Sequence, residues 1–338
     1  MKRSYGAYRF APHLVEMLRE ELAAAALLPL LVDLDTTDLM INENGAVYVE
    51  ALGEPVRRLD GVTVDADALE SILGTVASLH GEVITQESPI LEAALPIGNA
   101  RLQAVLPPLV AAPVVAIRKP PARTLSLDDL VAFGTLPRGL ADELAAAVVT
   151  RRSVVVAGGV GSGKTTLLNA LLAALLAAEP EERIVVLEEG ARELHAEGAN
   201  LIRLLTSDLA GVDMTRLLRT ALRLNPDRIL VGEVRGAEAL DWLRASNTGH
   251  PGGLLTLHAS GAAEAIDRLD ALVQEAGIPS QLRRVAQALD LIVFLARTST
   301  GRRVVEVLEV EGLDDAGRPS TRSLYAAPAD GGPHPPRR

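Results

Sequence analysis

A β-branched run, a glycine-rich loop and an apolar helical stretch follow one another at residues 153–178, and this order constrains the fold more than any other feature. The first part reads SVVVAGGVGSGKTT and satisfies the pattern G-x-x-x-x-G-K-[ST] from Gly158 to Thr165. Glycines let backbone N–H groups turn inward around phosphate oxygens at the start of the following helix. A chance match of a glycine-rich turn is disfavoured, because the expected strand and helix flank the loop. The segment predicts a site for a nucleoside triphosphate.

The side chains of this loop have distinct expected roles. Lys164 should reach the β- and γ-phosphates, Thr165 should place its hydroxyl on Mg²⁺, and Thr166 should begin the helix. The predicted cofactors are therefore ATP and Mg²⁺. The remaining predicted nucleotide-binding residues of the loop are Gly158, Gly159, Gly161, Ser162 and Gly163.

Composition excludes several classes of function. The 338 residues, 48% of them hydrophobic, are enough for two cores, and the absence of Cys excludes disulfides, a thiol nucleophile and cysteine-ligated metal. A net charge of −11 argues against a broad electrostatic grip on DNA or RNA, so no direct sequence-specific nucleic-acid binding is expected. Neither a signal peptide nor a membrane-spanning helix is predicted, which favours a cytoplasmic location.

The chain divides into two halves around a proline-rich segment. Residues 1–119 predict an α+β domain with a helix over 12–28 stopped by Pro29, and residues 120–127 predict a linker because paired prolines stop helix and strand. The other elements expected in this half are a hairpin of 38–42 and 46–50 around Asn44-Gly45, a helix from Asp65 to about His80, and strands near 102–105 and 114–117.

Strands and helices alternate through residues 128–325, which predicts an α/β domain with a mainly parallel sheet covered on both faces. Residues 326–338 are rich in Pro and Gly and predict a disordered tail. Besides the strand before the phosphate loop, the expected strands are 183–187, 228–231, 253–257, 291–296 and 304–310. One expected helix begins at 128, and the others are 138–149, 214–224, 237–246 and 262–275.

The segment RILVGEVRG at residues 228–236 is an apolar strand ending in an acidic residue. The carboxyl ends of such strands line the nucleotide crevice. Gly232 stands where the usual Walker B motif has Asp, so Glu233 alone remains to orient the attacking water. The alternative is an ordinary charged residue at a strand end.

Further carboxylates and two histidines are candidates for the same site. Glu188 and Glu189 directly follow the strand predicted at 183–187, and Glu189 is the predicted metal ligand beside Thr165, although a solvated turn explains the pair equally well on spacing alone. His250 and His258 flank the strand at 253–257 without metal-ligand spacing, so they are candidates for sensing nucleotide or for a structural role.

Several segments together resemble the hexameric secretion ATPases of the type II/type IV secretion and pilus-assembly superfamily, and most of all those of conjugal transfer. The resemblance runs from about residue 10 to residue 312. It rests on the phosphate loop, on the glycine and glutamate at 232–233 followed by Arg235, and on four further segments: ESPILEAALP at 87–96, Arg101 ahead of VLPPL at 105–109, AIRK at 116–119, and TGHPGGLLTLH at 248–258.

The resemblance implies a RecA-like P-loop motor domain behind a smaller α+β N-terminal domain, with copies assembled in a hexameric ring. It places the catalytic glutamate on Glu233 and implies that Arg118, together with Arg101, reaches toward the phosphates, where an arginine spreads developing charge. The residues alone favour ordinary surface or linker charge for these arginines, since most arginines are solvated. The family's histidine box falls on the segment from His250 to His258.

The family's acidic box fits in two registers. In one it starts at Glu188 and has one extra residue before Glu193, and in the other it starts at Glu189 with Gly190 at the second acidic position. Glu189 belongs to both registers, so the roles of Glu188 and Glu193 stay open.

The predicted function is therefore an ATPase that powers conjugal pilus assembly or type IV secretion from the cytoplasmic face of the inner membrane, with secretion or pilus proteins as partners. A tight-adherence or type II secretion ATPase is the nearest alternative. A RecA-like DNA motor is disfavoured by the acidic charge and by the 2% aromatic content. A GTPase is disfavoured because Asn-Lys-x-Asp is absent, and a nucleotide-locked scaffold because Lys164, Thr165 and Glu233 are intact.

Overall fold

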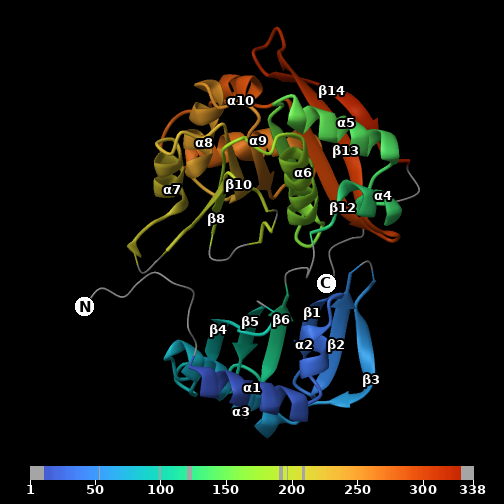
Figure 1. The fold of residues 1–338 in the computed structure, drawn as a ribbon, viewed down its shortest axis with the longest axis vertical. Coiled ribbons are helices and arrows are strands. Elements are labelled where there is room, and N and C mark those ends of the chain that lie inside the picture. The colour runs from blue at the N-terminus through green and yellow to red at the C-terminus, as the bar shows by residue number, and fades with distance from the viewer. Residues whose placement is uncertain are drawn as a thin grey trace. The chain divides into compact units, whose positions relative to one another are not determined.

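The chain forms two compact units, Met1–Arg123 and Thr124–Arg338, each with its own sheet (Figure 1). The computed structural model describes residues 11–328 except 53, 99, 120–123, 190–192, 196 and 208–209. Part of the predicted linker and most of the predicted tail therefore lie outside the described residues.

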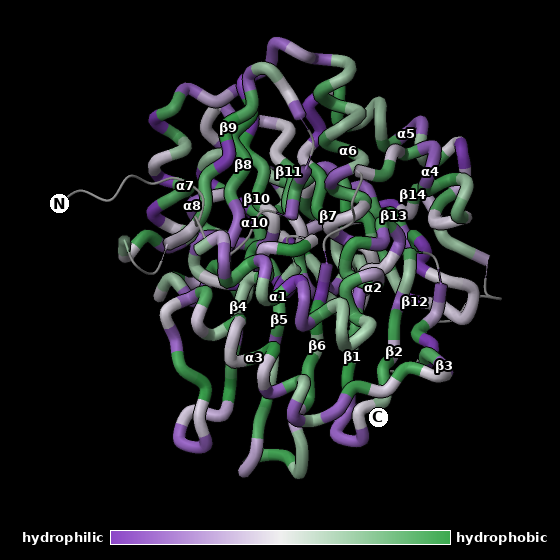
Figure 2. The backbone as a smooth tube through the Cα atoms, turned by 60° about the horizontal axis from the view of Figure 1, so that its bottom comes forward, coloured by the Kyte–Doolittle hydropathy of each residue, from purple (hydrophilic) through white to green (hydrophobic). Residues whose placement is uncertain are grey.

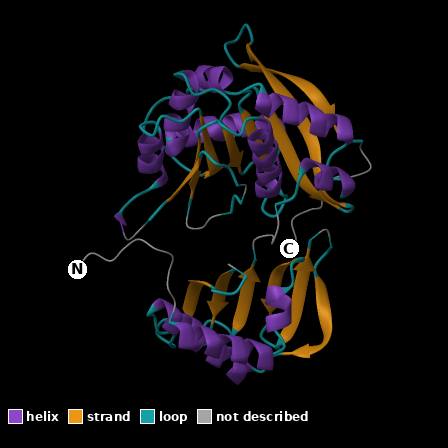
Figure 3. Ribbon diagram, viewed as in Figure 1, coloured by secondary structure: helices purple, strands orange, loops and turns teal. Residues whose placement is uncertain are grey.

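The N-terminal unit is an antiparallel six-stranded sheet in the order β3-β2-β1-β6-β5-β4. Its helices gather on one face of this sheet, which is an α+β arrangement (Figure 3). The strands are β1 (Thr36–Ile41), β2 (Ala46–Ala51), β3 (Arg57–Thr63), β4 (Ile90–Ala94), β5 (Arg101–Val105) and β6 (Val114–Arg118), and the helices are α1 (Pro12–Ala24), α2 (Leu28–Val32) and α3 (Ala66–His80).

Local chemistry explains most of these elements. The Asn44 side chain accepts a hydrogen bond from the backbone of Ala46 in the β1–β2 turn, and Asp65 caps α3 by accepting from the backbone of Asp67. One prediction is wrong: the first helix ends at Ala24, and Pro29 lies in the first turn of α2 instead of stopping a helix. Proline is tolerated there because the first turn needs no intrahelical N–H bond.

The C-terminal unit has an eight-stranded sheet in the order β14-β13-β12-β7-β11-β10-β8-β9. All neighbouring pairs from β12 to β9 are parallel, and β13 and β14 add antiparallel strands at one edge. This arrangement confirms the predicted α/β class. The strands are β7 (Val154–Gly158), β8 (Ile184–Glu188), β9 (Leu201–Leu205), β10 (Arg228–Val234), β11 (Leu254–Leu257), β12 (Leu291–Thr298), β13 (Gly301–Leu313) and β14 (Pro319–Ala326).

The helices of this unit pack in two groups, α4 to α6 and α7 to α10. Strands of a parallel sheet that helices cover on both faces are buried on both sides. Accordingly, every residue of β7, β8 and β11 is buried. Figure 2 shows the hydrophobic residues along these central strands. The helices are α4 (Leu127–Ala132), α5 (Arg138–Val149), α6 (Lys164–Ala178), α7 (Met214–Ala221), α8 (Glu238–Asn247), α9 (Ala262–Gln274) and α10 (Leu282–Ala288).

None of the helices within the described ranges combines the length and the apolar character that crossing a membrane requires.

Candidate active site

The phosphate loop joins the carboxyl end of β7 to the amino end of α6. Gly158 has a φ of +155°, and a β-carbon there would lie 2.3 Å from the carbonyl oxygen of Leu295, so only glycine fits. The helix begins at Lys164, two residues earlier than predicted, and Thr166 lies within its first turn. The loop backbone therefore meets the N-terminus of a long helix, which is the geometry that favours an anion.

Lys164 and Ser162 point their polar atoms into the loop. Lys164 is 8% exposed, and its ammonium donates to the carbonyl oxygens of Gly158 (3.1 Å) and Gly159 (3.0 Å). The buried hydroxyl of Ser162 makes no hydrogen bond to any residue in the described part of the chain. A buried hydroxyl without a partner is costly, and a bound phosphate would satisfy it.

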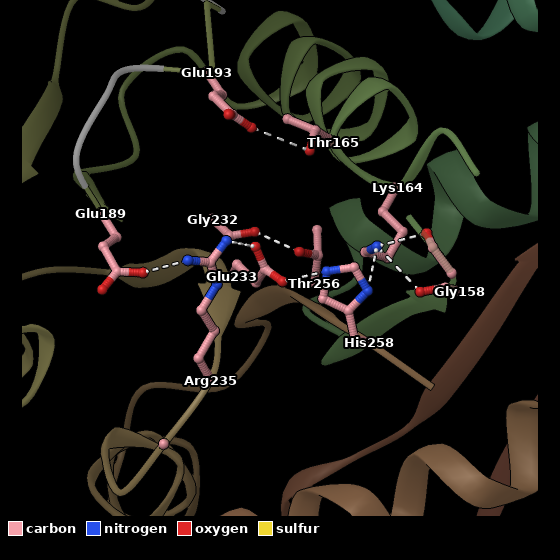
Figure 4. Close-up of polar contacts among 12 residues, drawn as sticks. Gly158, Lys164, Thr165, Glu189, Glu193, Gly232, Glu233, Arg235, Thr256 and His258 are labelled. Atoms are coloured by element: carbon pink, nitrogen blue, oxygen red, sulfur yellow. Dashed lines mark hydrogen bonds and ion pairs between the residues drawn. The ribbon is translucent and has the colours of Figure 1, made fainter. Parts of the chain in front are cut away.

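A line of polar contacts runs from the phosphate loop across β10 to the end of β8 (Figure 4). Nδ1 of His258 lies 3.3 Å from the Lys164 ammonium, and its Nε2 lies 2.7 Å from Oε1 of Glu233. Arg235 donates one hydrogen bond to Oε2 of Glu233 (2.7 Å) and another to Oε2 of Glu189 (2.8 Å). The structure thus brings together four predicted residues and Arg235.

Burial, and then the charge of Lys164, lower the pKa of His258 below its ordinary value of 6.5. The imidazole is therefore neutral at neutral pH, and its contact with Glu233 is not an ion pair. A neutral ring between a lysine and a carboxylate can respond to either group by changing its tautomer or its protonation state.

Residues 193–195 of the acidic segment that follows β8 are held in place by two side chains. Glu188, 3% exposed, accepts through Oε1 from the backbone N–H groups of Glu193 (2.6 Å) and Leu194 (2.8 Å). Asn169 of α6 donates to the carbonyl oxygen of Glu193 (2.9 Å) and accepts from the backbone of His195 (2.8 Å). As a result, Oε2 of Glu193 lies 3.5 Å from the hydroxyl of Thr165.

The side chain of Glu188 lies beside Gly232, where the usual Walker B motif has Asp. A β-carbon on Gly232 would lie 3.4 Å from Cγ of Glu188, which is an ordinary van der Waals distance, so the Glu188 side chain lies directly beside position 232. Burial raises the pKa of Glu188, and its Oε2 is buried with no hydrogen-bond partner among the described residues. A carboxylate from the neighbouring strand β8 therefore lies next to position 232.

The residues beside Thr165 fit a magnesium ion that is held mainly by phosphate and water. No group of three His, Cys, Asp or Glu side chains forms a ready cation cage in the part of the chain that the structure describes. Mg²⁺ in nucleotide sites needs only one or two carboxylates besides phosphate oxygens and water. The unpartnered oxygen of Glu188 and the carboxylate of Glu193 meet that requirement, whereas the predicted ligand Glu189 pairs with Arg235.

Three further predicted residues come from other parts of the chain. Arg101 and Arg118 are in the N-terminal unit, exposed and directly opposite each other on β5 and β6. His250 precedes β11, at the opposite end of that strand from His258.

Sequence reasoning did not assign roles to two contributors, Arg235 and Asn169. Arg235 was detectable, because residues 233 and 235 point to the same side of an extended chain. The side chain of Asn169 acts on a loop 24 residues away, which no local pattern reveals.

Comparisons with known proteins agree on one family of proteins to which this chain is similar. The family model described as type II/IV secretion system protein matches residues 21–317. A probable conjugal transfer protein TrbB of Sinorhizobium fredii is 41% identical over 304 residues, covering 90% of this chain and 91% of that protein. A conjugal transfer protein TrbB of Rhizobium radiobacter is 40% identical, covering 90% and 92%. The X-ray structure of the Legionella pneumophila ATPase DotB aligns with a TM-score of 0.60 and 21% identity, covering 90% of this chain and 82% of that one, which supports the fold.

Proposed function

Because the chain belongs to the type II/IV secretion system protein family, we propose that it is an ATP-hydrolysing motor that powers conjugal pilus assembly or type IV secretion. The observation that carries this proposal is the unbroken line of contacts from Lys164 through His258 to Glu233. It joins a phosphate-binding group to a candidate base at the carboxyl edge of a parallel sheet, where nucleotides bind.

The chemistry of the site follows from these positions. The Lys164 ammonium exchanges its two carbonyl partners for the β- and γ-phosphate oxygens. Glu233 orients a water molecule for attack on the γ-phosphorus and accepts its proton, while the bond to the β-phosphate oxygen breaks and ADP leaves with the electron pair. Mg²⁺, bound near Thr165 with Glu188 and Glu193, would neutralise phosphate charge.

We propose that Arg118 and Arg101 also serve hydrolysis by stabilising charge on the transferred phosphoryl group. The support is the family resemblance, together with the placement of two arginines directly opposite each other.

The proposal extends to the working assembly. The motor acts as a homo-hexamer, peripheral to the cytoplasmic face of the inner membrane, with membrane secretion or pilus proteins as partners. The family membership supports this assembly, and the net charge of −11 supports the absence of sequence-specific nucleic-acid binding.

Lys164→Ala tests the assignment of the loop. ATP binding should fall below detection because the phosphates lose their main cationic partner, while the melting temperature without nucleotide stays close to that of the parent. Calorimetry with ATP and Mg²⁺ gives the affinity, and circular dichroism controls for folding. Near-parental affinity in a folded variant would show that the nucleotide does not bind at this loop, and it would contradict the proposed function.

A further inference from the structure

We propose that Arg235 is a positioning residue for hydrolysis: its guanidinium holds Glu233 in the orientation that activates water and ties it to Glu189. This inference rests on the proposed function, because it assigns a role within the same site. The side chain of Arg235 donates hydrogen bonds to Glu233 and Glu189, neither of which belongs to the phosphate loop.

The geometry of the contact carries the proposal. Arg235 directly follows β10, and Glu189 directly follows β8, which lies beside β10 in parallel register. One guanidinium therefore joins two carboxylates from adjacent strands, with donor–acceptor distances of 2.7 and 2.8 Å. A planar guanidinium fixes the angle between its two bonds, so it restrains the rotation of Glu233 more tightly than a lysine could.

The two oxygens of Glu233 are in different situations. Oε2 accepts from Arg235, whereas Oε1 is buried and lies near Nε2 of His258 in a geometry that makes no hydrogen bond with a described residue. Arg235 thus restrains Oε2 and leaves Oε1 without a hydrogen bond to a described residue. Misplacement of such a group costs rate even where binding is intact.

The exposure of the side chains separates this role from a structural one. The Arg235 side chain is 61% exposed and Glu233 only 21%. Exposed ion pairs contribute little to folding stability, so removal of Arg235 should leave the fold intact. Its effect should appear in the rate of the chemical step.

The experiment is a double-mutant cycle of Arg235→Gln and Glu233→Gln in the full chain, with Arg235→Lys as the conservative variant. Arg219→Gln is the matched control, because Arg219 is also exposed (65%) and pairs with a carboxylate, Asp241, in the same unit. Steady-state ATP hydrolysis gives kcat and KM, calorimetry gives ATP affinity, and circular dichroism gives the melting temperature.

Glu233→Gln should lower kcat by roughly 10²–10⁴-fold. Arg235→Gln should lower kcat by roughly 10²-fold while KM and ATP affinity stay within about threefold of the parent. Arg235→Lys should recover part of that loss, and Arg219→Gln should behave as the parent. Adding Arg235→Gln to Glu233→Gln should lower kcat no further, because one residue acts through the other.

Two results with Arg235→Gln would overturn the inference while leaving the proposed function intact. One is parental kcat in Arg235→Gln when Glu233→Gln is slow. The other is an equal loss of kcat from Arg235→Gln in both backgrounds, which would mean that Arg235 acts on the phosphates directly. If Arg235→Gln has a lowered melting temperature, Arg235→Lys replaces it in the test. A folded Arg235→Lys protein with parental kcat would also overturn the inference. Parental kcat in Glu233→Gln, or no hydrolysis by the parent, would instead contradict the proposed function and this inference with it.

Discussion

His258 connects the two charged groups that the proposed reaction needs, since its ring lies between Lys164 and Glu233. Burial lowers the pKa of His258 and also that of His195 in the acidic segment. The unfolded chain, with ordinary histidine pKa values, therefore takes up protons at higher pH than the folded chain does. Stability from these residues is fully present above pH 6.5 and is lost as the pH falls through the folded pKa values.

His258→Asn should reduce this acid sensitivity. Between about pH 7.5 and about pH 5.5 the melting temperature of the parent should fall more than that of the variant, because the variant lacks one group that must be protonated on unfolding. Glu188, whose raised pKa works in the opposite direction, is present in both proteins. Equal falls in the two proteins would contradict a neutral His258 in the folded state.

The clamp between α6 and the acidic segment determines which carboxylate lies beside Thr165. Glu188 is engaged with backbone N–H groups, and Asn169 holds the same loop from the helix side. This arrangement favours a structural role for Oε1 of Glu188 and brings Glu193 to the start of α6.

Asn169→Ala should loosen this loop. The side chain is 7% exposed and makes two hydrogen bonds to the loop backbone, each worth about 0.5–1.5 kcal/mol, so stability should fall by about 1–3 kcal/mol. The Mg²⁺ concentration for half-maximal hydrolysis should rise, because Glu193 is no longer held near Thr165.

Urea unfolding and a Mg²⁺ titration of ATPase activity measure the two effects. Asn247→Ala is the control, because that exposed amide makes one hydrogen bond, to the carbonyl of Arg284. Asn169→Ala with the stability and Mg²⁺ dependence of this control would show that the clamp does not hold the loop.

At the scale of the whole molecule, the contribution of the N-terminal sheet to ATP hydrolysis has to be tested. Each has its own buried core, and the paired arginines are on strands of the first. An arginine that acts only as charge develops on the phosphoryl group should change kcat far more than nucleotide affinity.

Arg118→Ala should therefore slow hydrolysis by roughly 10³-fold and weaken ATP binding only modestly. Arg57→Ala is the matched control, because Arg57 is an exposed arginine on the same sheet with a local partner, Glu54. Steady-state kinetics, calorimetry and light scattering give the rate, the affinity and the particle mass. Parental turnover in an Arg118→Ala protein of unchanged mass would show that this arginine takes no part in hydrolysis.

The sequence determined the elements that rest on local chemistry. The hairpin at Asn44-Gly45, the cap at Asp65, the helix Arg138–Val149 and the strand–loop–helix around Lys164 all follow from turn residues, caps and apolar periodicity. Two of the strands that the sequence did not predict, β3 and β9, lack such a signal. Most residues of β3 are exposed and those of β9 are all half-buried, so neither strand has an alternating apolar face.

For the candidate site, the sequence supplied Lys164 and Glu233 as candidates, because a phosphate loop and a strand ending are local patterns. Only the tertiary structure decided that Arg235 bridges Glu233 and Glu189, that Glu188 lies beside Gly232, and that Asn169 binds the backbone of a segment 24 residues away. These contacts join strands and helices far apart in sequence. Their partners are set by sheet order and register, which the sequence of each element does not contain.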